Sequence, residues 1–188
     1  MPVKSLDRRA RMTREILKQS LIELMHDKPI HEISIKKICE TADVNRSTFY
    51  HHYDSQYELF NDILNDVGND ISEIVKKHLN TSDVLKLSLI EIFTYIEKNQ
   101  ELFLVIFCEN SGFSVGETLT SYVEHFFRVN DAVTSEIAKY YLQFATAGMT
   151  SVIWQWLNAE ERMSATELAN VITHILAPSF SKLVFLPF

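Results

Sequence analysis

The sequence predicts an all-α fold, and two observations carry this prediction. Glycine and proline are scarce, with four of each in 188 residues, whereas a β-rich chain needs many turns. Few segments alternate apolar and polar residues at the period of two that a half-buried strand requires. Because 46% of the residues are hydrophobic, the chain has enough apolar mass for one or two small cores.

The first helix is expected over Arg8–His26. Leu17, Leu21 and Leu24 recur there at the spacing of one helical face. Pro29 follows closely, and proline has no backbone N–H with which to continue a helix. A single amphipathic helix that ends before Pro29 is therefore predicted.

Two short helices are expected next. Ser34 precedes the second helix in the N-cap position, where its hydroxyl can accept a bond from a free N–H of the first turn. The apolar stripe of this helix consists of Ile35, Ile38, Cys39 and Ala42. The third helix is expected to begin at Asn45, a second capping residue, and to run through Tyr53.

The remaining chain predicts longer amphipathic helices. Ser55 and Glu58 have the spacing of a capping box at the start of a fourth helix, which continues past residue 74. Pro178 is expected to end the last helix. The helices expected between these points are Ser82–Lys98, Glu101–Asn110, Ser114–Asn130, Asp131–Asn158 and Ser164–Leu176.

The third predicted helix, in the stretch NRSTFYHHY, divides its side chains between two faces. At about 100° per residue, one face is polar and the other carries aromatic anchors. The polar face holds Arg46, Ser47, Tyr50 and His51, and the other holds Phe49, His52 and Tyr53, with Thr48 on the border. Two helices joined by a tight turn form a helix-turn-helix, whose second helix enters the DNA major groove. The polar face is then free to contact phosphates and base edges.

The net charge of −7 is unevenly distributed. Residues 1–60 carry ten basic and nine acidic side chains, whereas residues 61–188 carry eight and sixteen. The first fourteen residues include a basic arm formed by Arg8, Arg9, Arg11 and Arg14. On composition alone, such an arm is a solvated start of a helix. Beside a helix-turn-helix it indicates contact with DNA phosphates.

Membrane, metal and enzyme functions find little support. The longest apolar run, Leu102–Cys108, is too short to cross a bilayer and the N-terminus has no secretory pattern, so a cytoplasmic protein is expected. The two cysteines lack a CxxC spacing, and the adjacent histidines of the third helix point in different directions, so no metal site is expected. Glu160 and Glu161 have no partner for acid–base chemistry, and the glycines form no phosphate-binding loop. Neither an enzyme nor a cofactor is predicted.

Residues 33–60, ISIKKICETADVNRSTFYHHYDSQYELF, resemble the DNA-binding region of TetR-type transcriptional regulators. The family pattern is close to I-T-x-x-x-I-A-x-x-A-G-V-S-x-G-T-F-Y-x-Y-F-x-S-K-x-x-L. The matching residues include Ile38, Ala42, Val44, Thr48, Phe49, Tyr50, Ser55 and Leu59. The C-terminal part resembles the helical domain of the family more loosely, through AGMTSVIWQWL at Ala147–Leu157. Together with LDRRARMTREIL near the start, this stretch is similar to the branch of quasi-TetR activators of dihydroxyacetone-kinase operons.

The resemblance implies a DNA-binding domain over residues 1–54 and a helical domain for dimerisation and effector binding over residues 55–188. It implies a sequence-specific transcriptional regulator, expected to be a repressor, that acts as a homodimer on a pseudo-palindromic operator. The dimer is expected to form through the last two long helices. The expected DNA contacts are Arg8, Arg9, Arg11, Arg14, Ser34, Lys36, Lys37, Asn45, Arg46, Ser47, Thr48, Tyr50, His51 and His52.

Three positions depart from the family pattern. Asp43 stands where glycine is frequent, so the turn must use aspartate, which tolerates left-handed backbone geometry better than most residues. Asp54 and Gln56 stand where lysine is common, so two phosphate contacts expected of the family are absent. The basic arm could supply the missing charge.

The function of the C-terminal helices remains open between two alternatives. Their aromatic residues could line a ligand cavity, but aromatic stripes at helical spacing are also what the core of a bundle requires. The polar and tyrosine residues that a pocket could use are Tyr95, Tyr122, His125, Gln143, Thr146 and Gln155. The alternative to a ligand-controlled DNA-binding protein is a helical interaction module or co-activator that a protein partner controls. The effector could thus be a small molecule or a protein.

Overall fold

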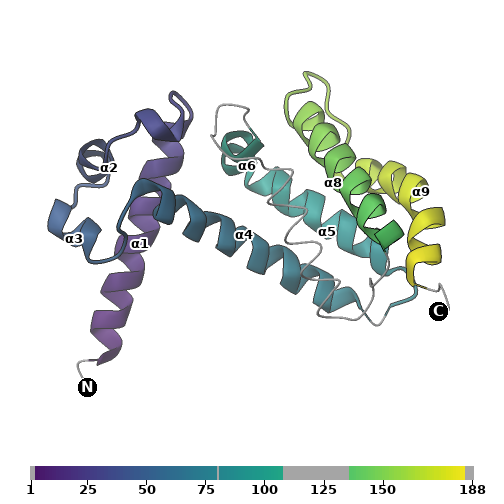
Figure 1. The fold of residues 1–188 in the computed structure, drawn as a ribbon, viewed down its shortest axis with the longest axis horizontal. Coiled ribbons are helices and arrows are strands. Elements are labelled where there is room, and N and C mark those ends of the chain that lie inside the picture. The colour runs from purple at the N-terminus through teal and green to yellow at the C-terminus, as the bar shows by residue number, and fades with distance from the viewer. Residues whose placement is uncertain (1–2, 80, 108–135, 185–188) are drawn as a thin grey trace. The chain divides into compact units, whose positions relative to one another are not determined.

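The structure, a computed structural model, describes residues 3–79, 81–107 and 136–184. Every regular element in these ranges is helical, which confirms the predicted all-α fold (Figure 1). The elements are α1 (Val3–Met25), the short 3-10 helix η1 (Ile30–Glu32), α2 (Ile35–Thr41), α3 (Arg46–Tyr50), α4 (Gln56–His78), α5 (Val84–Lys98), α6 (Gln100–Phe107), α8 (Glu136–Leu157) and α9 (Ala165–Val184). The helix expected over Ser114–Asn130 lies outside the described residues.

The chain forms two compact units, and the division between them falls within α4, after Val67. The first unit contains α1, η1, α2, α3 and the beginning of α4, and the second contains the end of α4 together with α5, α6, α8 and α9. The domain boundary expected at residue 54 stays a prediction. Among the described residues, no helix is both long and apolar enough to span a bilayer.

The first unit has a small core to which each of its longer helices contributes. Leu17 and Leu21, one turn apart on α1, are fully buried, as is Ile38 of α2. Phe49 of α3 and Leu59 of α4 are also fully buried. The apolar stripes of α1, α2 and α4 therefore meet in one place, and Phe49 anchors the five-residue α3 there.

The turn between α2 and α3 confirms the role expected of Asp43. Its φ is 51°, in the left-handed region. Among the described residues other than glycine, Asp43 alone has a positive φ. The N–H of the next residue, Val44, donates to the carbonyl of Cys39 at 3.0 Å and closes the turn. Aspartate accepts this conformation more readily than most residues with a Cβ.

Helix capping follows the prediction at two sites and departs from it at a third. Ser34 accepts a bond from the N–H of Lys37 at 3.2 Å, and Ser55 accepts one from the N–H of Glu58 at 3.2 Å. Asn45 occupies the N-cap position of α3 but its side chain makes no capping bond, so that expectation was wrong. The backbone carbonyl of Asn45 accepts from two N–H groups of the first turn, at 2.9 and 3.1 Å.

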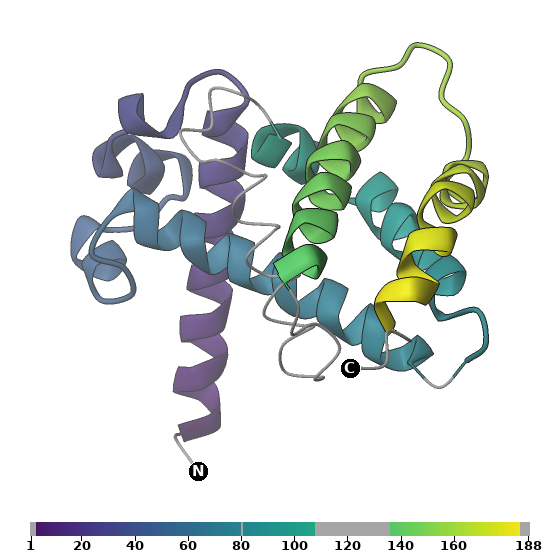
Figure 2. The ribbon, with the colours of Figure 1, turned by 45° about the vertical axis from the view of Figure 1, so that its right-hand side comes forward.

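Two predicted helix ends were also wrong. Helix α3 ends at Tyr50 rather than Tyr53, because the N–H groups of His52 and Tyr53 both bond to the carbonyl of Phe49 and form a turn. Helix α9 continues through Pro178 to Val184. A proline inside a helix removes one backbone hydrogen bond and kinks the axis without ending the helix when the flanking turns persist. The ribbon of α9 accordingly changes direction along its length (Figure 2).

The second unit is built on α5, which packs along α9, while α6 packs against α8. Phe93 and Ile96 of α5 are buried, and the ring of Phe93 lies 5.9 Å from that of Trp156 on α8. The indole of Trp156 donates to the carbonyl of Met163 at 2.8 Å. The guanidinium of Arg162 lies over the same indole, 5.5 Å from its centre, and fixes the connection between α8 and α9.

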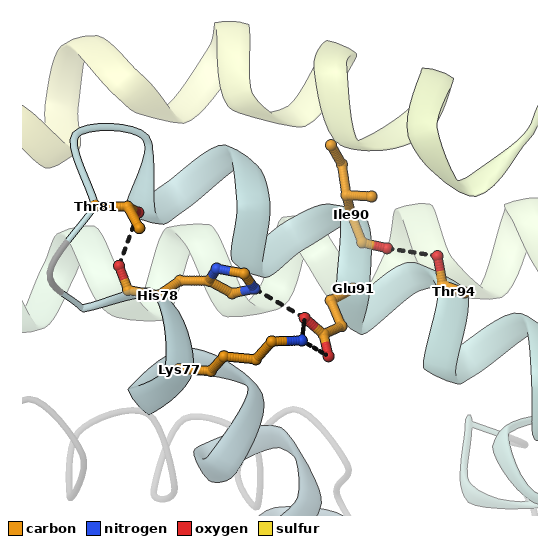
Figure 3. Close-up of polar contacts among 6 residues, drawn as sticks. All are labelled: Lys77, His78, Thr81, Ile90, Glu91 and Thr94. Atoms are coloured by element: carbon orange, nitrogen blue, oxygen red, sulfur yellow. Dashed lines mark hydrogen bonds and ion pairs between the residues drawn. The ribbon is translucent and has the colours of Figure 1, made fainter.

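A charged cluster joins the end of α4 to α5 (Figure 3). The Nζ of Lys77 lies 2.8 and 2.9 Å from the two carboxylate oxygens of Glu91, and the Nε2 of His78 lies 2.8 Å from one of them. These bonds lower the pKa of Glu91, with Lys77 as the largest cause and His78 next. Glu91 is therefore a carboxylate that receives two donors from another helix.

Candidate nucleic-acid interface

The two faces predicted for the third helix are present in the structure. Phe49 is fully buried and Tyr53 is 5% exposed, so the aromatic face points into the core. The polar face is open to solvent, with 56% of Tyr50 exposed. Its four members are Arg46, Ser47, Tyr50 and His51, and Thr48 is half-buried at the border. Side chains that can donate and accept hydrogen bonds thus project together from a helix held by two aromatic anchors.

The aromatic rings in and directly after α3 contact one another. Phe49 meets the ring of Tyr50 edge-on, with centroids 5.7 Å apart, and meets that of Tyr53 at 6.0 Å. His52 is half-buried, and its pKa is lowered first by burial and then by the charges of His51 and Arg14. A lowered pKa keeps the His52 ring neutral at pH 7, so it offers one donor and one acceptor rather than a positive charge.

The basic arm lies on α1. Arg8, Arg9, Arg11 and Arg14 are all exposed, and none of them forms an ion pair with another described residue. Arg14 is near enough to the end of α3 to lower the pKa of His52. The guanidinium groups are therefore available to an external anion, and at least one of them lies beside the third helix.

Two of the three residues expected at α2 have local partners, and the start of α4 is acidic. Ser34 caps α2, Lys36 pairs with Glu40 at 3.6 Å and Lys37 is exposed. The carboxylate of Glu58 accepts from the N–H of Asp54 at 2.6 Å, so the first turn of α4 carries negative charge. Such charge favours the helix N-terminus but repels phosphate.

A polar network beneath α3 was not predicted. Lys18 of α1 is only 8% exposed, and its Nζ lies 2.8 Å from the Oδ2 of Asp62 and also contacts Asp66, both on α4. The hydroxyl of Tyr53 donates to the same Oδ2 of Asp62 at 2.7 Å. A sequence signal existed, because Lys18 falls on the same helical stripe as Leu21 and Met25, where a charged residue requires a partner.

The residues expected for a ligand pocket are placed as follows. Tyr95 of α5 donates to Asp70 at 2.8 Å, and the buried Thr146 of α8 donates to the carbonyl of Leu142 at 2.8 Å. Gln143 and Gln155 are exposed on α8. Tyr122 and His125 lie outside the described residues. A role for these residues in ligand binding stays a prediction.

The fold and this site define a DNA-binding transcriptional regulator of the helix-turn-helix class. Residues 19–63 match the model of the tetR family of bacterial regulatory proteins, and residues 83–177 match a model described as the C-terminal region of transcriptional regulators, which carries the name TetR. The two matches together cover most of the chain, including both units. The chain belongs to the TetR family of transcriptional regulators. The family and the fold are those of regulators rather than enzymes.

Individual relatives agree with this assignment. The dhaKLM operon transcriptional activator DhaS of Lactococcus lactis is 27% identical over 118 residues, which span 63% of this chain and 56% of that protein. This similarity confirms the resemblance to activators of dihydroxyacetone-kinase operons. A TetR regulator from Streptococcus agalactiae has a similar structure, with a TM-score of 0.67, 20% identity and coverage of 93% of this chain and 98% of that one. NalD, the secondary repressor of the MexAB-OprM multidrug efflux pump in Pseudomonas aeruginosa, has a TM-score of 0.62, 22% identity and coverage of 93% and 98%.

Proposed function

We propose that the protein binds a pseudo-palindromic operator as a homodimer and inserts α3, the recognition helix, into the major groove. The observation that carries this proposal is the division of α3 into a buried aromatic face and an exposed polar face. Arg46 can donate two parallel bonds to a guanine edge or one bond to a phosphate. Tyr50, Ser47 and His51 add shorter donors and acceptors beside it.

The basic arm supplies the affinity that does not depend on sequence. Arg8, Arg9, Arg11 and Arg14 are exposed and unpaired among the described residues, so each can neutralise a phosphate without breaking an internal bond. This compensates for the acidic start of α4, where Asp54 and Glu58 offer no phosphate contact. Each phosphate neutralised steepens the dependence of binding on salt by about one unit.

Dimerisation through α8 and α9 is supported by their exposed apolar side chains. Tyr140 and Phe144 of α8 are 71% and 75% exposed, and Val171 and Ile175 of α9 are 48% and 58% exposed. Large apolar side chains at such exposure mark surfaces that associate. Gly148 follows Phe144 by one turn, and a Cβ placed on it meets no atom within 4 Å. The packing of a single chain does not require glycine there, whereas close approach of a second helix does.

Control of the regulator is proposed to act through α4, which contributes to both compact units. An effector bound to the second unit, near the predicted pocket residues, can change DNA affinity only if it binds the DNA-competent state with a different affinity. The reciprocal effect of operator on effector must then have the same size. The effector is proposed to be a small molecule, with a protein partner as the alternative.

Repression is the proposed outcome. A dimer that occupies an operator can repress with the proposed DNA-binding and dimerisation surfaces alone. Activation is a second candidate, and the observation that favours it is the 27% identity to DhaS, which is an activator. An activator needs a further contact with the transcription machinery or a coactivating protein. A reporter gene placed behind the operator separates the two outcomes by the sign of its response.

Selection of bound duplexes from a random pool tests the proposal. A dimeric regulator is expected to enrich a motif with two-fold symmetry whose half-sites lie about one helical turn apart or a multiple of it. Enrichment of a motif without symmetry would contradict the dimeric mode of binding. Failure to bind any duplex at low salt would favour the interaction-module alternative.

A further inference from the structure

The recognition helix is too short to hold its own direction. Helix α3 has five residues, and one of them, Phe49, is fully buried. Contacts between apolar groups are less directional than hydrogen bonds, so the packing of Phe49 alone specifies the direction of the helix only weakly. A second fixed point is required to set the direction in which Arg46 and Tyr50 project.

Tyr53 provides that second point. Its ring lies 6.0 Å from that of Phe49, and its hydroxyl donates to the Oδ2 of Asp62 at 2.7 Å. A hydrogen bond weakens steeply when its angle changes, so this contact specifies an orientation that apolar packing does not. The acceptor lies on α4 and is itself held by Lys18 of α1, at 2.8 Å.

The charges of the network are well defined. Burial disfavours the Lys18 ammonium, but its hydrogen bonds to Asp62 and Asp66 outweigh burial and raise its pKa. Burial likewise opposes ionisation of Asp62, yet its bonds from Lys18 and Tyr53 lower its pKa. Burial and then the bond to Asp62 raise the pKa of Tyr53. At neutral pH a protonated hydroxyl therefore donates to a carboxylate held by an ammonium group.

We propose that the Tyr53–Asp62–Lys18 network is a positioning device that fixes the direction of the recognition helix and thereby determines discrimination between DNA sequences. The inference rests on the proposed function, because it concerns how the same helix reads its operator. None of the three residues is exposed beside Arg46 and Tyr50, so their effect on DNA is exerted through the orientation of α3. One member of the basic arm, Arg14, lies near enough to this network to lower the pKa of Asp62. Tyr53→Phe changes no charge, so it is the variant that separates the orientation of α3 from the phosphate contacts of the arm.

Two variants of the full chain test the proposal, with two labelled duplexes as probes. Tyr53→Phe keeps the ring and removes the hydroxyl, and Asp62→Asn keeps the shape of the acceptor and removes its charge. One duplex carries the motif selected from the random pool, and the other is a scrambled duplex of the same length. Glu91→Gln is the matched control, because Glu91 also accepts bonds from two donors of another helix, in the second unit (Figure 3).

If Tyr53→Phe lowers the correctly oriented fraction of α3 to about one tenth, binding to the selected duplex weakens about tenfold. Binding to the scrambled duplex is expected to stay within about twofold, because it depends on phosphate contacts. Asp62→Asn should have the same effect, and the double variant should be no worse than the stronger single one, as expected of one network. Glu91→Gln should leave both affinities unchanged.

Two results would overturn the inference. In the first, both network variants bind the selected duplex as tightly as the wild type does. In the second, the variants lose the same factor of affinity for the selected and the scrambled duplex. Equal weakening in Glu91→Gln would overturn it too, because the effect would then not be specific to this network. If Tyr53→Phe does not fold, Asp62→Asn carries the same expectation alone. A wild-type protein that binds neither duplex would instead refute the proposed function.

Discussion

Substitutions on the two faces of α3 should have different effects: one should reduce the stability of the first unit, and the other should reduce only DNA binding. A comparison of the Phe49→Ala and Tyr50→Phe variants tests this. Phe49 is fully buried and lies in contact with two other aromatic rings, whereas 56% of Tyr50 is exposed. The first substitution removes a ring from the core of the first unit. The second removes one hydroxyl from the surface proposed to contact DNA.

The expected magnitudes differ widely. Replacement of a fully buried phenylalanine by alanine costs about 3–5 kcal/mol. A unit of roughly 70 residues has about 3–10 kcal/mol of stability in total, so Phe49→Ala is expected to melt more than about 12 °C lower or to leave the first unit unfolded. Tyr50→Phe should change stability by less than about 0.5 kcal/mol, as is usual for surface substitutions.

The two tryptophans allow the damage to be located. Both Trp154 and Trp156 lie on α8, in the second unit, so tryptophan emission reports that unit alone, while far-ultraviolet circular dichroism reports both. Phe49→Ala should lose helical signal early on heating while the tryptophan transition stays in place, and it should not bind the selected duplex. Tyr50→Phe should give wild-type curves by both probes but weaker binding.

Two results would refute this reasoning. The first is a Phe49→Ala protein that melts like the wild type and still binds the selected duplex. The second is a Tyr50→Phe protein that is destabilised as severely as Phe49→Ala. Either result would mean that the burial of these two side chains does not describe their roles.

Three further predictions follow from other parts of the structure. Asp43→Ala should cost about 1 kcal/mol, because alanine tolerates a φ of 51° poorly, whereas Asp43→Gly should not destabilise, and urea unfolding compares them. Gly148→Leu should stabilise an isolated α8 by about 1 kcal/mol but split a dimer that packs there, so an unchanged dimer mass in light scattering would exclude that interface. Because the pKa of Asp62 is lowered in the folded state, its contribution is fully present above its unfolded pKa of about 3.8 and is lost as the pH falls through the folded value. Asp62→Asn should therefore be less stable at pH 7 and lose less stability on acidification, and equal pH profiles would contradict this assignment.

Much of the first unit could be predicted from the sequence because its determinants are local. The faces of α3 follow from the helical period, which separates Tyr50 from Phe49 regardless of the rest of the chain. The caps at Ser34 and Ser55 require only that a hydroxyl stands three residues before the backbone N–H that donates to it. The left-handed turn at Asp43 likewise depends on a few neighbouring residues.

Predictions from local sequence were wrong at three helix ends. Asn45 occupies the N-cap position of α3, but its side chain makes no capping bond, although Ser34 and Ser55 make such bonds at the equivalent positions of α2 and α4. Helix α3 could have continued through Tyr53, but the bonds to the carbonyl of Phe49 turn the chain toward α4. Helix α9 passes through Pro178, because the turns on both sides of a proline can persist when one hydrogen bond is lost.

By itself, the sequence determined the helical class, the exposed polar face of α3 and the basic arm, since each depends on the period of a helix or on the local density of charge. Only the tertiary structure decided that Lys18, Tyr53 and Asp62 share one set of bonds, and that Tyr140 and Phe144 remain exposed. A helical pattern states which side chains share a face, but it does not state which other helix covers that face. That choice is made by packing between segments far apart in the chain, where burial and the pairing of charges are settled together.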